Sequence, residues 1–378
     1  MRIALINHGT ASSWGGGDGV QIRETAKRLI QRGHKISIQN CDRPEIEDVD
    51  LVHIFNCRVH TSFIQQVSTC LSAGKPIVVS PIWISIGRAL WGSRGSVGIL
   101  EKAVSANKYE TKEALRLLRE RKMIVQLPNG SVDAQGKGTV DLSWQEQISE
   151  LLKKCQGMLP NSWLELKAIQ TDLQWWGDTY DIAHYGVNPQ TFLDADPEIF
   201  RNWSGIKQPF VMQAGRIEPA KNQAMLCWAL KEINIPIVLI GSKKHWPSYA
   251  ELCKSISGDR LQIIEHIPQE MLASAYAASG CHCLVSWMDT CGLVSLEASL
   301  SGTPLVGSSF GHELEYLEND AWIADPADPQ SIRSAVMGAW NSQRNYGRNL
   351  RMKRKSLERF NWENTTNKTE DMYKSILS

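Results

Sequence analysis

The sequence predicts an α/β protein made of two doubly wound domains that face a cleft. Apolar runs alternate with amphipathic segments from one end of the chain to the other, which is the βαβ rhythm of parallel sheets covered by helices. With 378 residues the chain exceeds one ordinary core, so two domains are expected. Polar residues and two prolines interrupt the alternation, which predicts a hinge near 186–208.

The first series begins with a buried strand at 2–7, a glycine loop at 15–20 and a helix at 21–33 that Gly33 closes. The other elements expected in this series are strands at 34–40, 50–56 and 75–83, a helical segment before the last of these, a helix at 101–123, a strand and turn at 124–130, a surface loop at 131–141, a strand leading into a helix at 157–163 with Asn161 or Ser162 as N-cap, and a strand and turn at 181–192.

The second series starts after the hinge with a strand at 209–215. Cys281 and Cys283 flank His282 in a later strand. Metal binding is one interpretation, but strand alternation places both thiols on one buried face, which favours a structural role. The other strands expected in this series lie at 235–241, 260–266, 281–287, 302–309 and 321–325.

The composition is that of a globular protein whose net charge creates no strong long-range electrostatic field. Hydrophobic residues make up 42%, charged residues 21%, and the net charge is +1, so no nucleic-acid partner is expected. Nine irregularly spaced cysteines favour a reducing, cytoplasmic setting. No apolar run reaches the ~18 residues of a membrane span, and the N-terminus does not resemble a signal peptide. The basic run 344–360 predicts a solvated helix face, with contact to anionic lipid or an acidic partner as the alternative.

Two acidic residues eight positions apart, Asp289 and Glu297, are the most informative feature of the sequence. The pattern predicts a strand that delivers Asp289 to a loop, then a helix that carries Glu297 on its inner face. Leu293, Glu297 and Leu300 have the i, i+4, i+7 spacing of one helix face. A carboxylate among aliphatic residues is costly unless it is hydrogen-bonded, so hydroxyl groups of a ligand are expected to satisfy Glu297.

A second cluster follows the first strand of the second series. Arg216 comes directly after that strand, and Lys221 and Asn222 follow where Pro219 predicts a helix start. Two cations and a helix N-terminus can converge on an anion such as a diphosphate, with two unrelated surface cations as the alternative. The tandem glycines at 15–19 lack the G-x-G-x-x-G and Walker spacings, so they predict either a close approach of backbone to a ligand or a tight turn.

Five segments carry a resemblance to a known family. They are GGGDGVQIRETAKRLIQRGHKI (15–36), HYGVNPQTF (184–192), AGRIEPAKN (214–222), DTCGLVSLEASLSGTPLV (289–306) and RFNWENTTNKTEDMY (359–373). Together they resemble the retaining glycosyltransferases of the GT-B fold, specifically glycosyltransferase family 4, over nearly the whole chain. The resemblance implies two Rossmann-like domains, an acceptor-side domain at 1–187 and a donor-side domain at 188–357, with a last helix at 358–378 that crosses back to the first domain.

The resemblance also implies roles for the matching residues. Arg216 and Lys221 would hold the donor diphosphate and stabilise the leaving group without a metal. Glu297 would bind the donor ribose, and Asp289 would reach the transferred sugar. Further donor contacts are implied for Gly16, Gly17, Gly215, Asn222, His266, Ile267, Thr290, Cys291, Gly292 and Leu293.

Three positions depart from the family pattern. Asp289 stands where a glutamate is usual, so its reach is one methylene shorter, and Cys291 replaces a phenylalanine. Many members carry a histidine after the strand that corresponds to 75–80, where this chain has Pro-Ile-Trp. His53 and Trp83 are therefore candidates for the acceptor side, with core packing as the alternative for each.

The resemblance thus implies a metal-independent, retaining enzyme that moves a sugar from a UDP- or GDP-linked donor to a hydroxyl of a saccharide or lipid-linked acceptor, in glycan, polysaccharide or glycolipid biosynthesis. No cofactor is expected besides this substrate. A cytoplasmic location with peripheral membrane contact is expected. The alternatives are a sugar-nucleotide epimerase and a catalytically weak homologue that binds nucleotide sugar. A phosphorylase would need a lysine for pyridoxal phosphate in a longer chain, and an oxidoreductase is disfavoured by the absent G-x-G-x-x-G.

Overall fold

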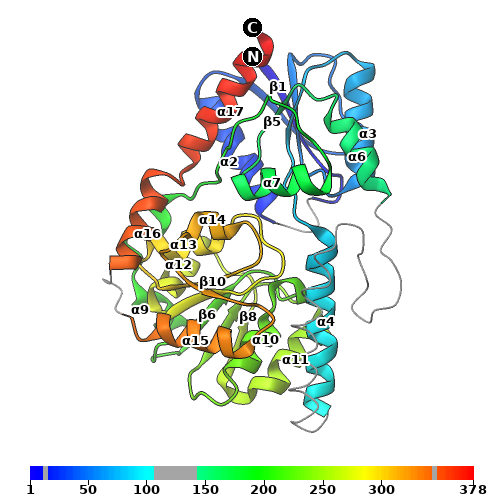
Figure 1. The fold of residues 1–378 in the computed structure, drawn as a ribbon. Coiled ribbons are helices and arrows are strands. Elements are labelled where there is room, and N and C mark those ends of the chain that lie inside the picture. The colour runs from blue at the N-terminus through cyan, green and yellow to red at the C-terminus, as the bar shows by residue number, and fades with distance from the viewer. Residues whose placement is uncertain (12–15, 106–142, 343–346) are drawn as a thin grey trace. The chain divides into compact units, whose positions relative to one another are not determined.

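The chain folds into two compact units, each built around a parallel sheet (Figure 1). This arrangement confirms the predicted α/β class with two doubly wound sheets. The computed structural model describes residues 1–11, 16–105, 143–342 and 347–378. The first unit comprises Met1–Ser85, Asp141–Gly186 and Arg359–Ser378, and the second comprises Ile86–Val140 and Val187–Glu358.

The sheet of the first unit has the strand order β2-β1-β3-β4-β5. From β1 the chain passes to β2 at one edge of the sheet, and it then crosses to β3 on the other side of β1. A topological switch point therefore lies between β1 and β3. The strands are β1 (Arg2–Asn7), β2 (Lys35–Asn40), β3 (Leu51–Phe55), β4 (Ile77–Ser80) and β5 (Gly157–Met158). The helices are α2 (Gly17–Gln31), α3 (His60–Ser72), α6 (Trp144–Leu152), α7 (Trp163–Asp172) and α17 (Trp362–Leu377).

The last helix of the chain, α17, lies along α2 within the first unit (Figure 1). Arg32 and His34, which follow α2, both contact Glu370, with N–O distances of 2.8 and 2.9 Å. The buried hydroxyl of Tyr373 lies 2.6 Å from Nδ1 of His53 in β3. These contacts join the C-terminal end of the chain to elements more than 300 residues earlier.

The sheet of the second unit has the order β11-β10-β9-β6-β7-β8. Its strands are short, and four of the six consist entirely of buried residues, as expected for a sheet covered on both faces. The strands are β6 (Val211–Ala214), β7 (Ile237–Ile240), β8 (Leu261–Ile264), β9 (Cys281–Leu284), β10 (Leu305–Ser308) and β11 (Trp322–Ala324). The helices are α4 (Ile86–Ser105), α8 (Pro189–Phe192), α9 (Pro197–Ser204), α10 (Gln223–Ala229), α11 (Pro247–Ser257), α12 (Gln269–Ala278), α13 (Leu293–Leu300), α14 (Glu313–Leu317), α15 (Pro329–Trp340) and α16 (Gly347–Glu358), with short 3₁₀ turns η1 (Pro219–Lys221) and η2 (Gly258–Arg260).

Helix α4 lies in the second unit, although the chain later returns to the first unit to form β5. It packs against η1, α10 and α11, and Leu100 is fully buried in the core of the second unit. Gly92 faces the ring of Trp287 so closely that a Cβ there would overlap it. The division at residue 187 therefore needs correction for the described residues 86–105, which belong to the second unit.

Other predicted elements differ in their bounds. The strand expected at 75–83 ends at Ser80, before a proline. The strand expected at 181–192 is wrong: only isolated bridges form there, at Tyr180 and Val187, and α8 begins at Pro189. Ser162 is the N-cap of α7, since its hydroxyl accepts from the amide of Glu165. The predictions for 106–142 lie outside the described residues.

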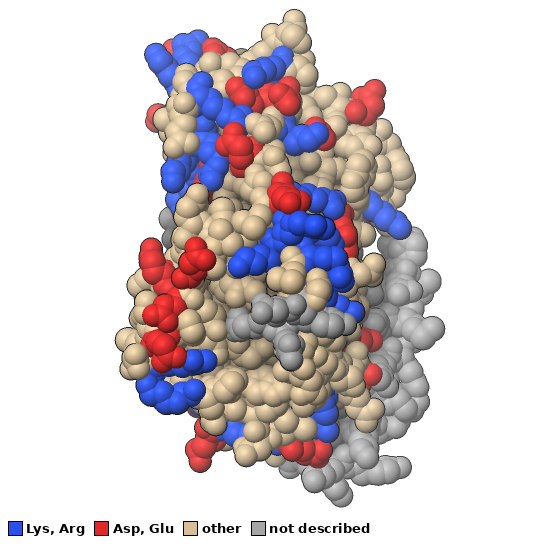
Figure 2. Space-filling model, turned by 90° about the vertical axis from the view of Figure 1, so that its left-hand side faces the viewer, with Lys and Arg blue, Asp and Glu red and all other residues tan. Residues whose placement is uncertain are grey.

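The basic run of the sequence forms α16, where Figure 2 shows Lys and Arg side chains gathered on one face. Arg351 contacts Asp320 at 2.8 Å, and Lys355 lies 2.6 Å from both Asp320 and Glu318. Much of this charge is therefore balanced within the second unit, which favours a solvated helix face. In the parts of the chain that the structure describes, no helix is both long and apolar enough to span a bilayer.

Candidate functional site

Lys221 and Asp289 form an ion pair at the carboxyl edge of the second sheet. The Lys221 Nζ lies 2.5 Å from Oδ2 of Asp289, and the two side chains are 19% and 12% exposed. Lys221 ends the turn that follows β6, and Asp289 follows β9, the strand paired with β6. Carboxyl ends of parallel strands meet at one edge of a sheet, so side chains 68 residues apart in sequence come together here.

The turn that carries Lys221 is fixed by hydrogen bonds to its backbone. The amide of Gln213 donates to the Lys221 carbonyl at 2.7 Å, and the Trp287 backbone N–H donates to the Ala220 carbonyl at 2.8 Å. Asn222 has a left-handed φ of 62°, and its buried amide donates to two backbone carbonyls, at 3.0 and 2.9 Å. The structure thus shows an anchoring role for Asn222, and Lys221 projects from a rigid frame.

Arg216 lies at the same edge, directly after β6. Its side chain is 39% exposed and contacts Glu218 at 3.1 Å. Gly215 and Gly241, after β6 and β7, approach so closely that any Cβ on Gly241 would overlap the Gly215 carbonyl. Glycine at position 241 therefore allows these two backbone segments to pack against each other. His266, which is exposed, and the buried Ile267 follow β8 at the same edge.

The turn after Asp289 leads into α13 through Gly292. The Gly292 amide donates to Oδ1 of Asp289 at 3.2 Å, and its φ of 64° lies in the left-handed region that favours glycine. Cys291 is buried, and burial raises the pKa of its thiol well above the usual value. Thr290 and Leu293 are partly exposed. The free N-terminus of α13 therefore begins beside the ion pair.

Glu297 lies on α13 and keeps only part of its surface exposed. The hydroxyl of Tyr276, from α12, donates to its Oε2 at 3.2 Å. Burial raises the pKa of Glu297 to about 7, although this hydrogen bond acts in the opposite direction. The protein thus supplies one hydroxyl to this carboxylate, and the surroundings still favour its neutral form.

Glu313 is a third acid at this edge, and no motif in the sequence points to it. It is fully buried, and its Oε1 accepts from the Ser308 backbone N–H at 2.9 Å. Its Oε2 has no hydrogen-bond partner among the described residues and lies where a Cβ on Gly292 would be. Burial, and then the charge of Asp289, raise the pKa of Glu313 well above its usual value. A neutral carboxyl group therefore lies behind the ion pair.

The other predicted residues belong to the first unit. Gly16 and Gly17 are exposed at the N-terminus of α2. His53 lies inside the sheet, where its ring nitrogens contact Tyr373 at 2.6 Å and Ser80 at 2.9 Å, and burial lowers its pKa to about 3.

Trp83 is fully buried, and its indole N–H donates to Asp172 at 2.9 Å. His53 and Trp83 are therefore core residues in this structure rather than candidates for an acceptor surface. The sequence pattern places His53 in a strand and Trp83 after one. It does not show that the polar atoms of these side chains form hydrogen bonds inside the core.

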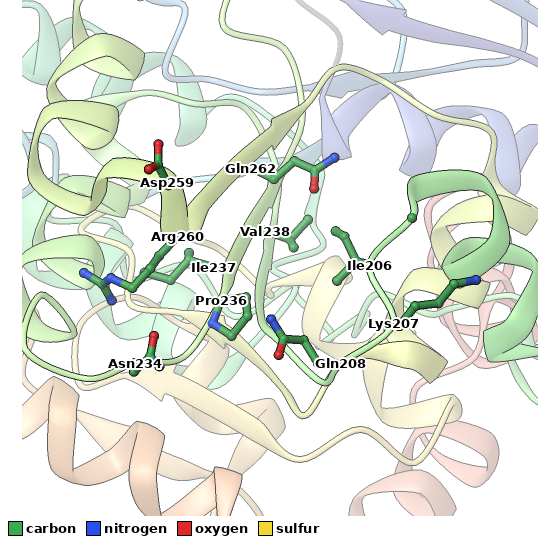
Figure 3. A pocket seen from close by; sticks show the side chains of 11 residues that line it. Ile206, Lys207, Gln208, Asn234, Pro236, Ile237, Val238, Asp259, Arg260 and Gln262 are labelled. Atoms are coloured by element: carbon green, nitrogen blue, oxygen red, sulfur yellow. The ribbon is translucent and has the colours of Figure 1, made fainter.

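A pocket of about 490 Å³ lies at the opposite, amino end of the second sheet (Figure 3). Its two cations already have partners: Lys207 donates to Asn202 at 2.9 Å, and the Arg260 guanidinium donates to three backbone carbonyls. Ligands of doubly wound sheets bind at the carboxyl end, so this pocket is not the candidate site.

The cysteines of β9 have a structural environment. Cys281 and Cys283 are fully buried with their sulfur atoms 4.0 Å apart, and burial lowers the pKa of His282 between them to about 3. Within the described ranges, no group of three or more His, Cys, Asp or Glu side chains is arranged to hold a metal ion.

Residues 196–357, which include all of the residues described above around Lys221, match the family model described as glycosyl transferases group 1. The match covers less than half of the chain, and it supports the resemblance predicted from the sequence.

Curated relatives are distant. An uncharacterised glycosyltransferase of Methanocaldococcus jannaschii is 25% identical over 52% of this chain and 54% of its own length. A D-inositol 3-phosphate glycosyltransferase of Kribbella flavida is 26% identical over 35% of each chain. The chain thus spans about half or less of the curated relatives that it matches.

Solved structures share the fold over the whole chain. A crystal structure of HepE from Anabaena with UDP and glucose has a TM-score of 0.72 at 14% identity, covering 99% of this chain and 100% of that one. Sucrose-phosphate synthase from Thermosynechococcus elongatus has a TM-score of 0.70 at 15% identity, covering 100% and 99%. At this identity the likeness shows the fold alone, which is the GT-B fold.

We predict that Glu313→Gln becomes more stable relative to the natural chain as pH rises. The folded state raises the Glu313 pKa above 4.5, the ordinary value. The unfolded chain therefore ionises first, and the natural protein loses this part of its stability as pH rises from about 4.5 toward the folded-state pKa. Glutamine retains the acceptor for Ser308 and does not titrate.

Urea unfolding at pH 4.5, 6 and 8 measures this difference in unfolding free energy. Glu315→Gln, on the same helix but partly exposed, is the matched control. A Glu313→Gln difference that stays constant across this range would contradict a neutral buried carboxyl group.

Proposed function

We propose that the protein is a retaining glycosyltransferase that moves a sugar from a nucleotide diphosphate sugar to an acceptor hydroxyl. The observation that carries the proposal is the Lys221–Asp289 ion pair beside Arg216 and the N-terminus of α13. It lies in the segment that matches the group 1 family. This arrangement offers fixed positive charge and backbone N–H groups to an anion, with a carboxylate adjacent to it.

Donor binding would rearrange the charges of the ligand-free site. Lys221 and Arg216 now face Asp289 and Glu218. A diphosphate would compete for both cations, and the Asp289 carboxylate would then accept hydrogen bonds from hydroxyls of the transferred sugar. The ion pair thus positions the side chains of Lys221 and Asp289 before the donor binds.

In the proposed reaction the bond between the sugar anomeric carbon and the diphosphate oxygen breaks, and its electron pair leaves with the diphosphate. Lys221 and Arg216 stabilise the negative charge that develops there, which is the work that a metal performs in other transferases. The acceptor oxygen attacks from the same face as the leaving group, and its proton passes to the departing diphosphate. Front-face substitution is favoured because no carboxylate is assigned as a nucleophile on the opposite face.

The proposed class of donor is supported by solved structures that are similar to this chain. The Anabaena structures contain UDP, glucose or UDP-glucose, which supports a UDP-linked donor, with a GDP-linked donor as the next choice. We propose a saccharide or lipid-linked acceptor and a role in glycan, polysaccharide or glycolipid synthesis in the cytoplasm. Cations of α16 such as Lys353 and Arg354, for which the described residues show no ion pair, would serve a peripheral contact with an anionic membrane.

We expect the natural protein to release nucleoside diphosphate slowly from one nucleotide sugar without added acceptor, and Lys221→Ala to reduce this rate by about 10²–10³-fold. The physical reason is loss of the cation that faces the leaving group. Lys254→Ala removes a lysine that contacts Glu251 on α11 and serves as the control. Unchanged release in Lys221→Ala would sink the diphosphate assignment, and donor binding without turnover in the natural protein would favour the catalytically weak homologue.

We also expect donor affinity to rise with pH between about 6 and 8. Glu297 has a pKa of about 7 in the ligand-free protein, and ribose hydroxyls donate to its ionised form, so donor binding favours loss of its proton. Calorimetry with a nucleotide sugar, whose diphosphate does not titrate in this range, measures the trend. Glu297→Gln should show no pH dependence, and a flat profile in the natural protein would argue against ribose binding at Glu297.

A further inference from the structure

The pocket at the amino end of the second sheet has no part in the proposed transfer reaction (Figure 3). Three segments of the second unit form it: residues 205–208 after α9, residues within 234–238 at the start of β7, and residues within 259–262, where η2 leads into β8. Its volume of about 490 Å³ falls within the range of roughly 300–1,000 Å³ that is usual for small-molecule sites. The pocket is therefore large enough for a ligand of its own.

Apolar side chains form the floor of the pocket. Val238 in β7 is buried, and Ile206 and Pro236, which are partly exposed, line the pocket with it. β8 is the edge strand of the sheet, and the parallel register pairs its Gln262 with Val238, so both side chains lie on the same face. Because Gln262 is exposed, this face of the sheet is open at its edge, and the floor can contact a ligand.

Three carboxamide groups surround this floor, those of Gln208, Asn234 and Gln262 (Figure 3). All three side chains are exposed, and none of them forms a hydrogen bond within the part of the chain that the structure describes. Each carboxamide has one acceptor oxygen and two donor hydrogens, which can pair with the N–H and C=O groups of a peptide bond. An apolar floor with unpaired amide groups at its rim thus suits a peptide, which presents apolar side chains and backbone amides together.

Opposite sides of the pocket carry opposite charges. Figure 3 shows Asp259, from η2, and Lys207, which follows α9, on either side of the apolar floor. Within the described ranges the carboxylate of Asp259 has no ion-pair or hydrogen-bond partner. The Lys207 ammonium donates to the neutral amide of Asn202 at 2.9 Å, which among the described residues leaves two of its three N–H donors for a ligand. A ligand with an ammonium group at one end and a carboxylate at the other matches this arrangement.

Other classes of ligand fit the pocket less well. Among the described residues that line it there is no aromatic ring, so a nucleobase or a sugar ring would find no stacking surface. The Arg260 guanidinium donates to three backbone carbonyls, so these donors are not available to a phosphate group. A phosphate would also meet the unpaired carboxylate of Asp259, which repels it.

We propose that this pocket binds a short peptide with free termini and apolar side chains. The ammonium group of the peptide pairs with Asp259, and its carboxylate pairs with Lys207. The apolar side chains contact the floor, and the rim carboxamides bond to the peptide groups. Both charged contacts are exposed to solvent, so each changes the affinity only a few-fold. The site lies at the opposite edge of the sheet from Lys221 and does not depend on the proposed transferase function.

Saturation-transfer NMR titration of the full chain with leucyl-leucine tests this site. The comparison probes are the same dipeptide with its amino end acetylated, the dipeptide with its carboxyl end amidated, and free leucine. We expect the uncapped dipeptide to bind most tightly and each cap to weaken binding at least threefold. Asp259→Asn should weaken binding of the uncapped dipeptide at least threefold and abolish the effect of acetylation. Lys207→Gln should do the same for amidation.

Glu251→Gln and Lys254→Gln are the matched controls, because these residues carry the same two charges on α11 without lining the pocket. Both should leave binding unchanged. Asp259 and Lys207 are exposed, so both test variants are expected to fold. Absence of dipeptide binding, equal binding of capped and uncapped dipeptides, tighter binding of free leucine, or undiminished binding in both variants would each overturn the proposal. The titrations contain no nucleotide, so failure of the peptide site leaves the transferase proposal standing.

Discussion

The ion pair of Lys221 and Asp289 is the interaction on which the site of the second unit depends. It joins the turn after β6 to the turn after β9, and Gly292 extends the contact to the start of α13. One cation balances one carboxylate there, so a second ionised carboxylate would be unpaired in a buried setting. Glu313 meets this constraint by keeping its proton.

The same constraint decides what kind of ligand this site accepts. In the proposed function, an anion with several oxygens would replace the Asp289 carboxylate at Lys221. That carboxylate would then accept hydrogen bonds from the ligand.

The pattern of apolar residues along the sequence predicts where the strands lie and which residues directly follow them. Buried parallel strands are continuous apolar runs, so their ends are visible, and Lys221 and Asp289 are polar residues that follow such ends. Other features depend on packing between distant segments. Helix α4 joins the second unit because Gly92 admits the ring of Trp287, and no local pattern contains that contact.

The same limit applies to single side chains of the site. Glu313 fits because glycines at 292 and 307 leave room for its carboxyl group. His53 and Trp83 show the converse. His53 lies within β3 and Trp83 follows β4, and in each a hydrogen-bond partner from a distant helix accounts for the polar atom.

Calorimetric titration of the full chain with UDP, GDP and ADP tests the central claim most directly. The account predicts that one of them binds with a dissociation constant in the range of about 10⁻⁶–10⁻³ M. It further predicts that Asp289→Asn binds the same nucleotide at least as tightly as the natural chain, because the competitor for Lys221 has lost its charge. Absence of binding by all three nucleotides, or loss of binding in Asp289→Asn with its fold intact, would contradict the account.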